Sequence, residues 1–175
     1  MNVWDAVNTK RAIRRFAERS LEPDRLERIV RAGTRAHSSK NQQRWAFIVV
    51  EDRDRLRALS KSGPHAGHVA GAAAAIALVT PDPRGPDQPL SVIWDIGGAA
   101  AQMMLVAWEL GIGSCPATVY EEAVARDILG YPDDWWCEYL LSFGYPADPG
   151  RLTAPNRPGG RRPLSEVVFR ERWGG

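Results

Sequence analysis

The spacing of apolar and polar residues along the chain predicts five helices and three strands. Helices are expected over 2–9, from Pro23 onward, and over 52–61, 92–110 and 121–129. Strands are expected over 45–50, 72–79 and 136–143, which are rich in β-branched and aromatic residues. Pro favours the first turn of the second helix, and Gly130 followed by Tyr131 and Pro132 is typical of a helix end. A last short element is expected over 164–169.

The helix expected over 92–110 is apolar on nearly all sides. A helix of that kind is buried on nearly all sides, because exposed apolar surface is unfavourable in water. In a chain of 175 residues, this indicates either a central helix or a helix at a subunit interface.

The order of elements is helix-rich and lacks the regular strand–helix–strand alternation of a doubly wound sheet. An α+β fold follows. We expect one domain over 1–175, with a C-terminal arm over about 147–175 that is rich in Pro, Gly and Arg. The segment 81–89 contains four prolines and is expected to be a connecting loop.

Charge is nearly balanced overall, at +2, but it is unevenly distributed. Residues 1–40 carry ten Lys and Arg against five acids, and residues 151–175 carry six Arg against two acids. Two basic ends suggest an anionic partner, which is either a phosphate-bearing cofactor or a nucleic acid. No known nucleic-acid-binding motif is present, so the cofactor is favoured.

Several protein classes are not supported by the sequence. The N-terminus lacks a signal-peptide pattern, and no apolar stretch of about 18 residues is free of charge or Pro, so a cytoplasmic protein without membrane contact is expected. Cys115 and Cys137 are too few for a disulfide scaffold, and we expect free thiols. Walker, Gly-x-Ser-x-Gly, His-Glu-x-x-His and dinucleotide-binding motifs are absent, and no metal ligands are predicted.

Three segments could bind a ligand. Residues 10–16 concentrate cations at the end of a helix, where Lys and Arg can hold a phosphate by charge-assisted hydrogen bonds, although a solvated basic turn is equally plausible. Residues 38–45 place hydroxyl and amide groups before a strand, where they could bind a heteroaromatic ring or simply cap the loop. Residues 160–164 could form a second phosphate clamp or an ordinary basic tail.

The order of these segments resembles the nitroreductase family of flavin enzymes. Residues 10–16 (Lys-Arg-Ala-Ile-Arg-Arg-Phe) are similar to that family's Arg-Arg-Ser-x-Arg-x-Phe opening. Residues 37–45 (His-Ser-Ser-Lys-Asn-Gln-Gln-Arg-Trp) are similar to its Pro-Ser-x-x-Asn-x-Gln-Pro-Trp signature. Gly-Ile-Gly-Ser-Cys at 111–115, Phe-Gly-Tyr-Pro at 143–146 and Arg-Arg-Pro-Leu at 161–164 resemble three further family motifs.

The resemblance implies an α+β fold with a central mixed β-sheet flanked by helices, in a homodimer with a long buried interface helix. It also implies FMN as the cofactor, bound at an active site shared by the two subunits. The residues that match the phosphate-binding positions are Lys10, Arg11, Ala12 and either Arg161 or Arg162. Those that match ring-binding positions contributed by the partner subunit are Ser38, Ser39 and Asn41.

Further positions follow from the same resemblance. His65 and His68 fall where family members place polar groups around the flavin, and Lys10 or Arg14 would lie near the N1/O2 edge of the ring. The backbone of Pro116, Ala117 and Thr118, which we expect to form a turn, would approach the ring near N5. Three positions depart from the family pattern, because Ala12 stands where Ser is usual and His37 and Arg44 stand where Pro is usual.

The implied activity is hydride transfer from NADH or NADPH through FMN to small acceptors such as nitroaromatics or quinones, by a ping-pong mechanism. The flavin would carry the chemistry, so no side chain need act as a catalytic acid or base. The alternative is a flavin-binding protein of the same fold with a storage, sensing or specialised biosynthetic dehydrogenase role. His37 and Arg44 could favour an anionic substrate, or they could be solvated loop residues.

Overall fold

A computed structural model describes residues 1–85, 90–155 and 160–174 of the chain. Its helices are α1 (Val3–Thr9), α2 (Pro23–Thr34), α3 (Arg53–Leu59), α4 (Ser91–Glu109) and α5 (Glu122–Leu129). Its strands are β1 (Ala46–Val50), β2 (Ala74–Pro81), β3 (Gly113–Thr118) and β4 (Trp135–Gly144). Short 3-10 helices lie at η1 (Ser39–Asn41), η2 (Gly67–Gly71), η3 (Pro149–Leu152) and η4 (Leu164–Glu166).

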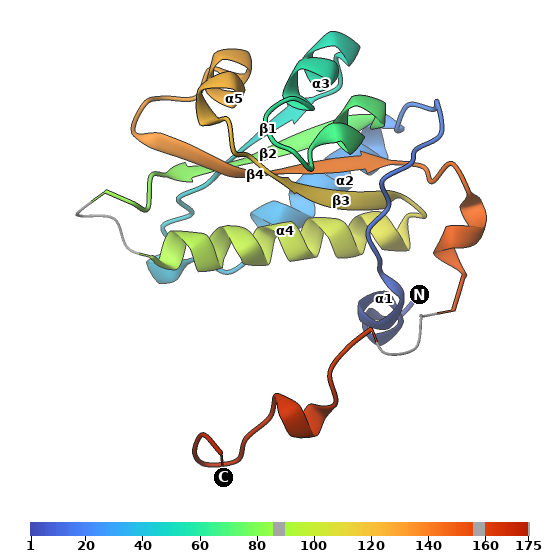
Figure 1. Ribbon diagram of the computed structural model, residues 1–175, viewed down its shortest axis with the longest axis vertical. Coiled ribbons are helices and arrows are strands. Elements are labelled where there is room, and N and C mark those ends of the chain that lie inside the picture. Colours follow the sequence, from blue (N-terminus) through green and yellow to red (C-terminus); the bar gives the residue numbers. More distant parts are fainter. Residues whose placement is uncertain (86–89, 156–159, 175) are drawn as a thin grey trace.

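The four strands form one sheet in the order β1-β2-β4-β3, between two layers of helices (Figure 1). Each neighbouring pair of these strands is antiparallel. A mixed sheet, with parallel and antiparallel pairing, was expected. In the described residues, the parallel pairing at this sheet is one bridge between Ala12 and Ser114 at the edge of β3. The α+β fold with flanking helices is confirmed.

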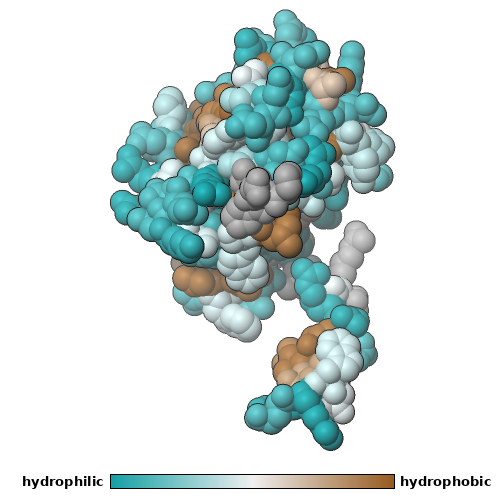
Figure 2. All heavy atoms as spheres, turned by 90° about the vertical axis from the view of Figure 1, so that its left-hand side faces the viewer, coloured by the Kyte–Doolittle hydropathy of each residue, from teal (hydrophilic) through white to brown (hydrophobic). Residues whose placement is uncertain are grey.

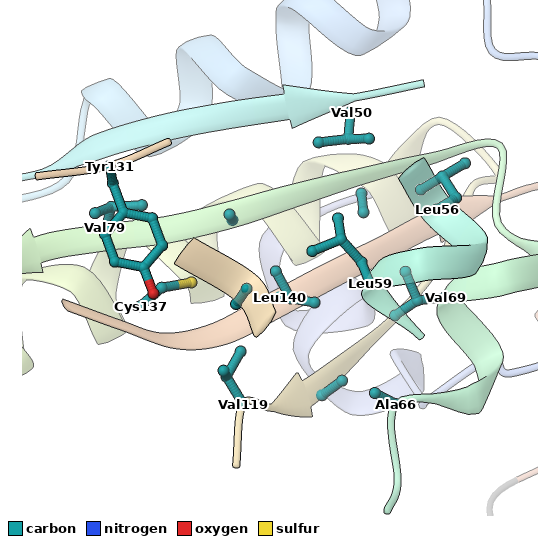
Figure 3. Packing of buried hydrophobic residues seen from close by; sticks show 14 residues of the cluster. Val50, Leu56, Leu59, Ala66, Val69, Val79, Val119, Tyr131, Cys137 and Leu140 are labelled. Carbon is teal, nitrogen blue, oxygen red and sulfur yellow. The ribbon is translucent and has the colours of Figure 1, made fainter. Parts of the chain in front are cut away.

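One face of the sheet is covered by α3, α5 and η2 and is sealed by a compact apolar cluster (Figure 3). Leu56 and Leu59 from α3, Val69 from η2 and Leu140 from β4 are fully buried there. The other face carries a second cluster, built by α2 and α4 with residues such as Ile29 and Met103. The core therefore lies on both faces of the sheet.

By length and composition alone, helix α4 is long and apolar enough to span a membrane, with a mean hydropathy of 1.2 over 18 residues. It nevertheless packs along α2 and the sheet, burying Ala99, Met103 and Ala107. The burial expected on nearly all sides is not complete within one chain, since Ile93 and Trp94 are exposed. Helix α4 is therefore a core helix with one uncovered apolar face.

The sequence prediction missed β3. Residues 116–118, expected as a turn, are the second half of this strand, which pairs with β4 alone among the four strands. An edge strand tolerates Pro because one side of its backbone makes no ladder bonds. Cys115 and Cys137 are free and buried, as expected.

The C-terminal segment extends away from the body of the molecule (Figures 1 and 2). Residues 160–174 are exposed throughout, including the apolar side chains Leu164, Val168 and Trp173. Their hydrophobic atoms form a distinct patch on the arm in Figure 2. The expected loop over 81–89 falls partly on residues 86–89, which lie outside the described residues.

Candidate functional site

Lys10 caps the C-terminus of α1 and points to α4, where its Nζ lies 4.0 Å from the Sδ of Met104. Burial lowers the pKa of Lys10, and the charge of Arg161 lowers it further, while Cys115 acts in the opposite sense. Arg161 belongs to the other basic end of the chain, 151 positions away in the sequence. Lys10 is therefore a part-buried cation held against α4.

Arg11 holds the start of the C-terminal arm. Its guanidinium donates to the carbonyl oxygens of Ala154, at 2.5 Å, and Pro155, at 3.4 Å, and its Nε donates to Thr9 at 3.2 Å. Its charge also lies 6.0 Å from the ring of Trp108. These bonds fix residues 154–155 beside the C-terminus of α1.

An open basic hollow lies between the segment after α1 and the loop before η2. Arg14, Pro64, His65, His68 and Pro116 line it, together with Gly67. Arg14, His65 and Pro116 are exposed, whereas His68 is half-buried. The structure therefore places Arg14, His65, His68 and Pro116 around one hollow.

An apolar groove of about 540 Å³ begins at the same Pro116 and runs between α4 and the sheet. Its walls include Ala100 and Met104 from α4 and Leu78 and Leu141 from the sheet. Met104 also contacts Lys10, so this cation lies at the side of the groove. A flat aromatic ligand that carries an anionic tail would fit such a surface, since apolar walls favour the ring and cations favour the tail.

A short hydrogen-bond chain supports β3 beside this hollow. The Oγ of Ser142 donates to the carbonyl of Cys115 at 3.1 Å and lies 2.8 Å from the Nδ1 of His68. Because the one hydroxyl proton of Ser142 goes to Cys115, Nδ1 of His68 must donate, and the neutral ring has its lone pair on Nε2. Burial, followed by the charge of Arg14, lowers the pKa of His68 and favours this neutral form.

Two buried side-chain atoms among the described residues lack a hydrogen-bond partner, and both lie at this site. One is Nε2 of His68, which lines the basic hollow, and the other is Oγ of Ser114, which neighbours Ala12 across the parallel bridge. Buried polar groups are nearly always paired, so an unpaired one in a folded protein calls for an explanation, such as a bound group.

The loop that contains Ser38, Ser39 and Asn41 packs on the N-terminal half of α4. The backbone N of Ser39 donates to the Asp95 carboxylate at 2.9 Å, and the Oγ of Ser38 accepts from the backbone N of Gln43 at 3.0 Å. Three of its residues have left-handed backbone conformations: Lys40 (φ 51°), Asn41 (φ 54°) and Gln43 (φ 51°). Such strain in residues other than Gly is concentrated at functional sites.

His37 adds to the same end of α4. Its ring lies 5.7 Å from that of Trp94, and a Cβ at Gly98 would come within 2.8 Å of it. Gly98 therefore makes room for His37. The side chains of His37 and Trp94 line a shallow apolar hollow that is open to solvent. The imidazole is thus a packing element of this surface.

The two halves of the predicted site lie far apart within one chain. Asp95, which holds the Ser39 loop, and Met104, which contacts Lys10, are separated by nine residues of α4. At 1.5 Å per residue, this is roughly 13 Å along the helix axis. One chain therefore does not bring Ser38, Ser39 and Asn41 to the basic hollow.

Sequence reasoning missed several residues of the site. Met104 was counted only as part of an apolar helix, and Ser142 only as part of a strand, because neither has a motif around it. Arg161 and Arg162 are both exposed, and of the two it is the charge of Arg161 that acts on the pKa of Lys10. No group of three or more His, Cys, Asp or Glu in the described ranges could hold a metal ion.

Fold and site together define a class of protein: an α+β chain in which a basic cluster adjoins an apolar groove beside an edge strand. The model of the nitroreductase family matches residues 7–67 and 58–145, which is more than half of the chain. The chain belongs to the nitroreductase family. This confirms the predicted fold and the general enzyme class, an oxidoreductase.

Relatives and solved structures agree with this assignment. A protein of Archaeoglobus fulgidus named "Putative NADH dehydrogenase/NAD(P)H nitroreductase" is 35% identical over 147 residues, covering 81% of this chain and 84% of the relative. A Thermus thermophilus protein named NADH dehydrogenase is 26% identical, covering 94% of this chain and 93% of the relative. The FMN-dependent nitroreductase of Clostridium difficile R20291 superposes with a TM-score of 0.82 at 24% identity, covering 97% of this chain and 100% of that one.

Proposed function

We propose that the protein binds FMN and transfers hydride from NADH or NADPH to nitroaromatics, quinones or similar small acceptors. The observation that carries this proposal is the contact of Lys10 with Met104, at the side of an apolar groove, with Arg11 beside it holding residues 154–155 of the C-terminal segment. Family membership and the names of the relatives, an NAD(P)H nitroreductase and an FMN-dependent nitroreductase among them, support it.

The residues present fit FMN. The phosphate needs cations, which Lys10 and Arg161 supply, with Arg11 close by. The ring needs an apolar groove and a few polar groups at its edge, which the groove at Pro116 and the unpaired Nε2 of His68 supply. Ala12 lacks the hydroxyl that is usual at its position, and the unpaired hydroxyl of Ser114 lies on the neighbouring strand.

When bound, FMN supplies the redox chemistry by accepting hydride from the nicotinamide and passing electrons to the acceptor. The chain would bind and orient the reactants. Arg14 would stabilise the negative charge left by reduction, since fixed cations favour anionic states in a partly dry site. The outer edge of β3 beyond Ser114 would offer backbone groups to the ring. The dinucleotide and the acceptor would use one groove in turn, which is a ping-pong mechanism.

We further propose a homodimer in which Ser38, Ser39 and Asn41 of each chain complete the site of the other. Two uncovered apolar surfaces support this: the face of α4 at Trp94, which is 72% exposed, and the C-terminal arm, where Trp173 is 88% exposed. Monomeric proteins rarely leave such surfaces uncovered. The second reason is that the Ser39 loop of the same chain contacts α4 roughly 13 Å along the helix from the residue that contacts Lys10.

The visible spectrum of the purified protein tests the proposal. We expect a yellow protein that releases FMN on denaturation and loses its colour rapidly on mixing with NADH or NADPH in a stopped-flow instrument. A colourless protein that cannot be reconstituted with FMN would refute flavin binding. A flavin that neither dinucleotide reduces would instead support the storage or sensing alternative.

A further inference from the structure

A β-bulge on β4 places an acidic side chain in the apolar groove. Leu78 of β2 pairs with Tyr139, but the next residue, Val79, pairs with Cys137, so Glu138 is an extra residue in the ladder. Successive strand residues normally point to opposite faces of a sheet. Here Glu138 and Tyr139 both line the groove between the sheet and α4, because the bulge redirects one of them.

The Glu138 carboxylate lies among mostly apolar residues and has no ion-pair partner in the described part of the chain. Trp136, Tyr139 and Ile93 are among the residues that line the groove with it, and no described residue forms a hydrogen bond or ion pair with its side chain. Burial raises the pKa of Glu138, and the charge of Arg84 opposes this only in part. A carboxylate in such a place costs free energy unless a ligand supplies the missing positive charge.

The nearest cation is already engaged by other acids. Arg84 binds Asp82 at 2.7 Å and Glu122 at 3.0 Å, and its guanidinium lies 5.2 Å from the ring of Trp136. Arg84 thus donates its hydrogen bonds to these two carboxylates, and no contact joins it to Glu138. The acidic character of this end of the groove therefore remains uncompensated.

We propose that Glu138 makes the acceptor site selective for flat aromatic acceptors that carry a positive charge. The groove walls bury the ring, the aromatic faces of Trp136 and Tyr139 attract the cation, and the carboxylate pairs with it. Acceptors with a carboxylate or sulfonate at the same position are repelled. This inference rests on the proposed function, in which the flavin ring lies at the Pro116 side of the groove and the acceptor occupies the part lined by Trp136, Glu138 and Tyr139.

The test compares wild type and variant on three nitroaromatic acceptors of different charge. These are 4-nitrobenzyltrimethylammonium, 4-nitrobenzyl alcohol and 4-nitrobenzenesulfonate, each measured with the FMN-loaded protein and NADH or NADPH. Replacing Glu138→Gln removes the charge but keeps the shape. We expect kcat/KM to fall about five-fold for the cation, to rise about two-fold for the anion and to stay constant for the alcohol. The matched control Glu121→Gln, at an exposed position before α5, should change none of them.

A binding measurement separates this inference from the proposed function. Isothermal titration calorimetry with N-methylquinolinium and with neutral quinoline needs no turnover. The wild-type protein should bind the cation about five-fold more tightly than quinoline, and Glu138→Gln should abolish that preference. Equal affinities in the wild type, or a preference that survives in Glu138→Gln, would overturn the inference. If the protein is yellow and reduced by NADH or NADPH in that case, the proposed function still stands.

Discussion

The two faces of the sheet are covered by helices of similar apolar character, yet only one is closed. On the face under α3 and α5, Leu56, Leu59 and Leu140 are fully buried in one packed cluster (Figure 3). On the face under α2 and α4, the α2 end is packed, but a groove of about 540 Å³ remains beside Pro116. The closed face holds the fold together, whereas the open face leaves apolar surface for a ligand or a second chain.

The largest loss of dimer and of bound FMN should come from a substitution on the uncovered face of α4. Trp94→Asp places a charge on a surface that we propose to bury between subunits, and burying an unpaired charge is very unfavourable. We expect monomers by light scattering and a loss of bound FMN of at least 100-fold. Val124→Asp, at an exposed position on α5, serves as the control and should remain dimeric. A Trp94→Asp dimer with full flavin content would show that this face is not the interface.

A cavity made in the closed face should lower the free energy of unfolding. Leu140→Ala removes a fully buried side chain from a packed cluster, and the cavity should lower the free energy of unfolding by about 2–5 kcal/mol. The exposed Val124→Ala on the same side should change it by less than about 0.5 kcal/mol. Urea titration of the two variants measures both values. Equal, small effects would mean that the closed face does not carry the stability of the fold.

Lys10 should contribute to binding of the FMN phosphate and not to binding of the flavin ring. Lys10→Ala removes one charge-assisted contact, so the affinity for FMN should fall by about 10- to 100-fold, while the affinity for riboflavin should not change. Arg55→Ala, on the exposed side of α3, provides a control of similar charge. Fluorescence titration with both flavins gives the comparison. Equal losses for FMN and riboflavin would place Lys10 away from the phosphate.

The smallest effect should be a pH dependence from His68. Burial lowers its pKa in the folded state, so the unfolded chain takes up a proton first as the pH falls below about 6.5. Folding stability should therefore decrease between pH 7 and pH 5. His68→Gln should flatten this decrease, as measured by thermal unfolding at several pH values. A variant with an unchanged slope would mean that His68 does not titrate in this range.

The sequence predicted the helices well because their apolar spacing and end signals are local. It linked the two basic ends to one phosphate only through family resemblance, since Lys10 and Arg161 are distant in the chain. It missed β3 because Pro116 is a poor strand residue, and only pairing with β4 at the sheet edge makes the strand form. The bulge at Glu138 depends on the register between β2 and β4, which no local pattern specifies.

The central claim is that each active site is built from two chains. It is tested most directly by mixing two variants, one altered at Lys10 and Arg14 and the other at Ser39 and Asn41, each replaced by Ala. Each variant alone should bind little FMN. A mixed dimer should contain one intact site and therefore bind one FMN. The two variants carry different tags, so that the mixed dimer can be purified and its FMN measured by absorbance. A mixed dimer that binds no more FMN than either variant alone would contradict the account.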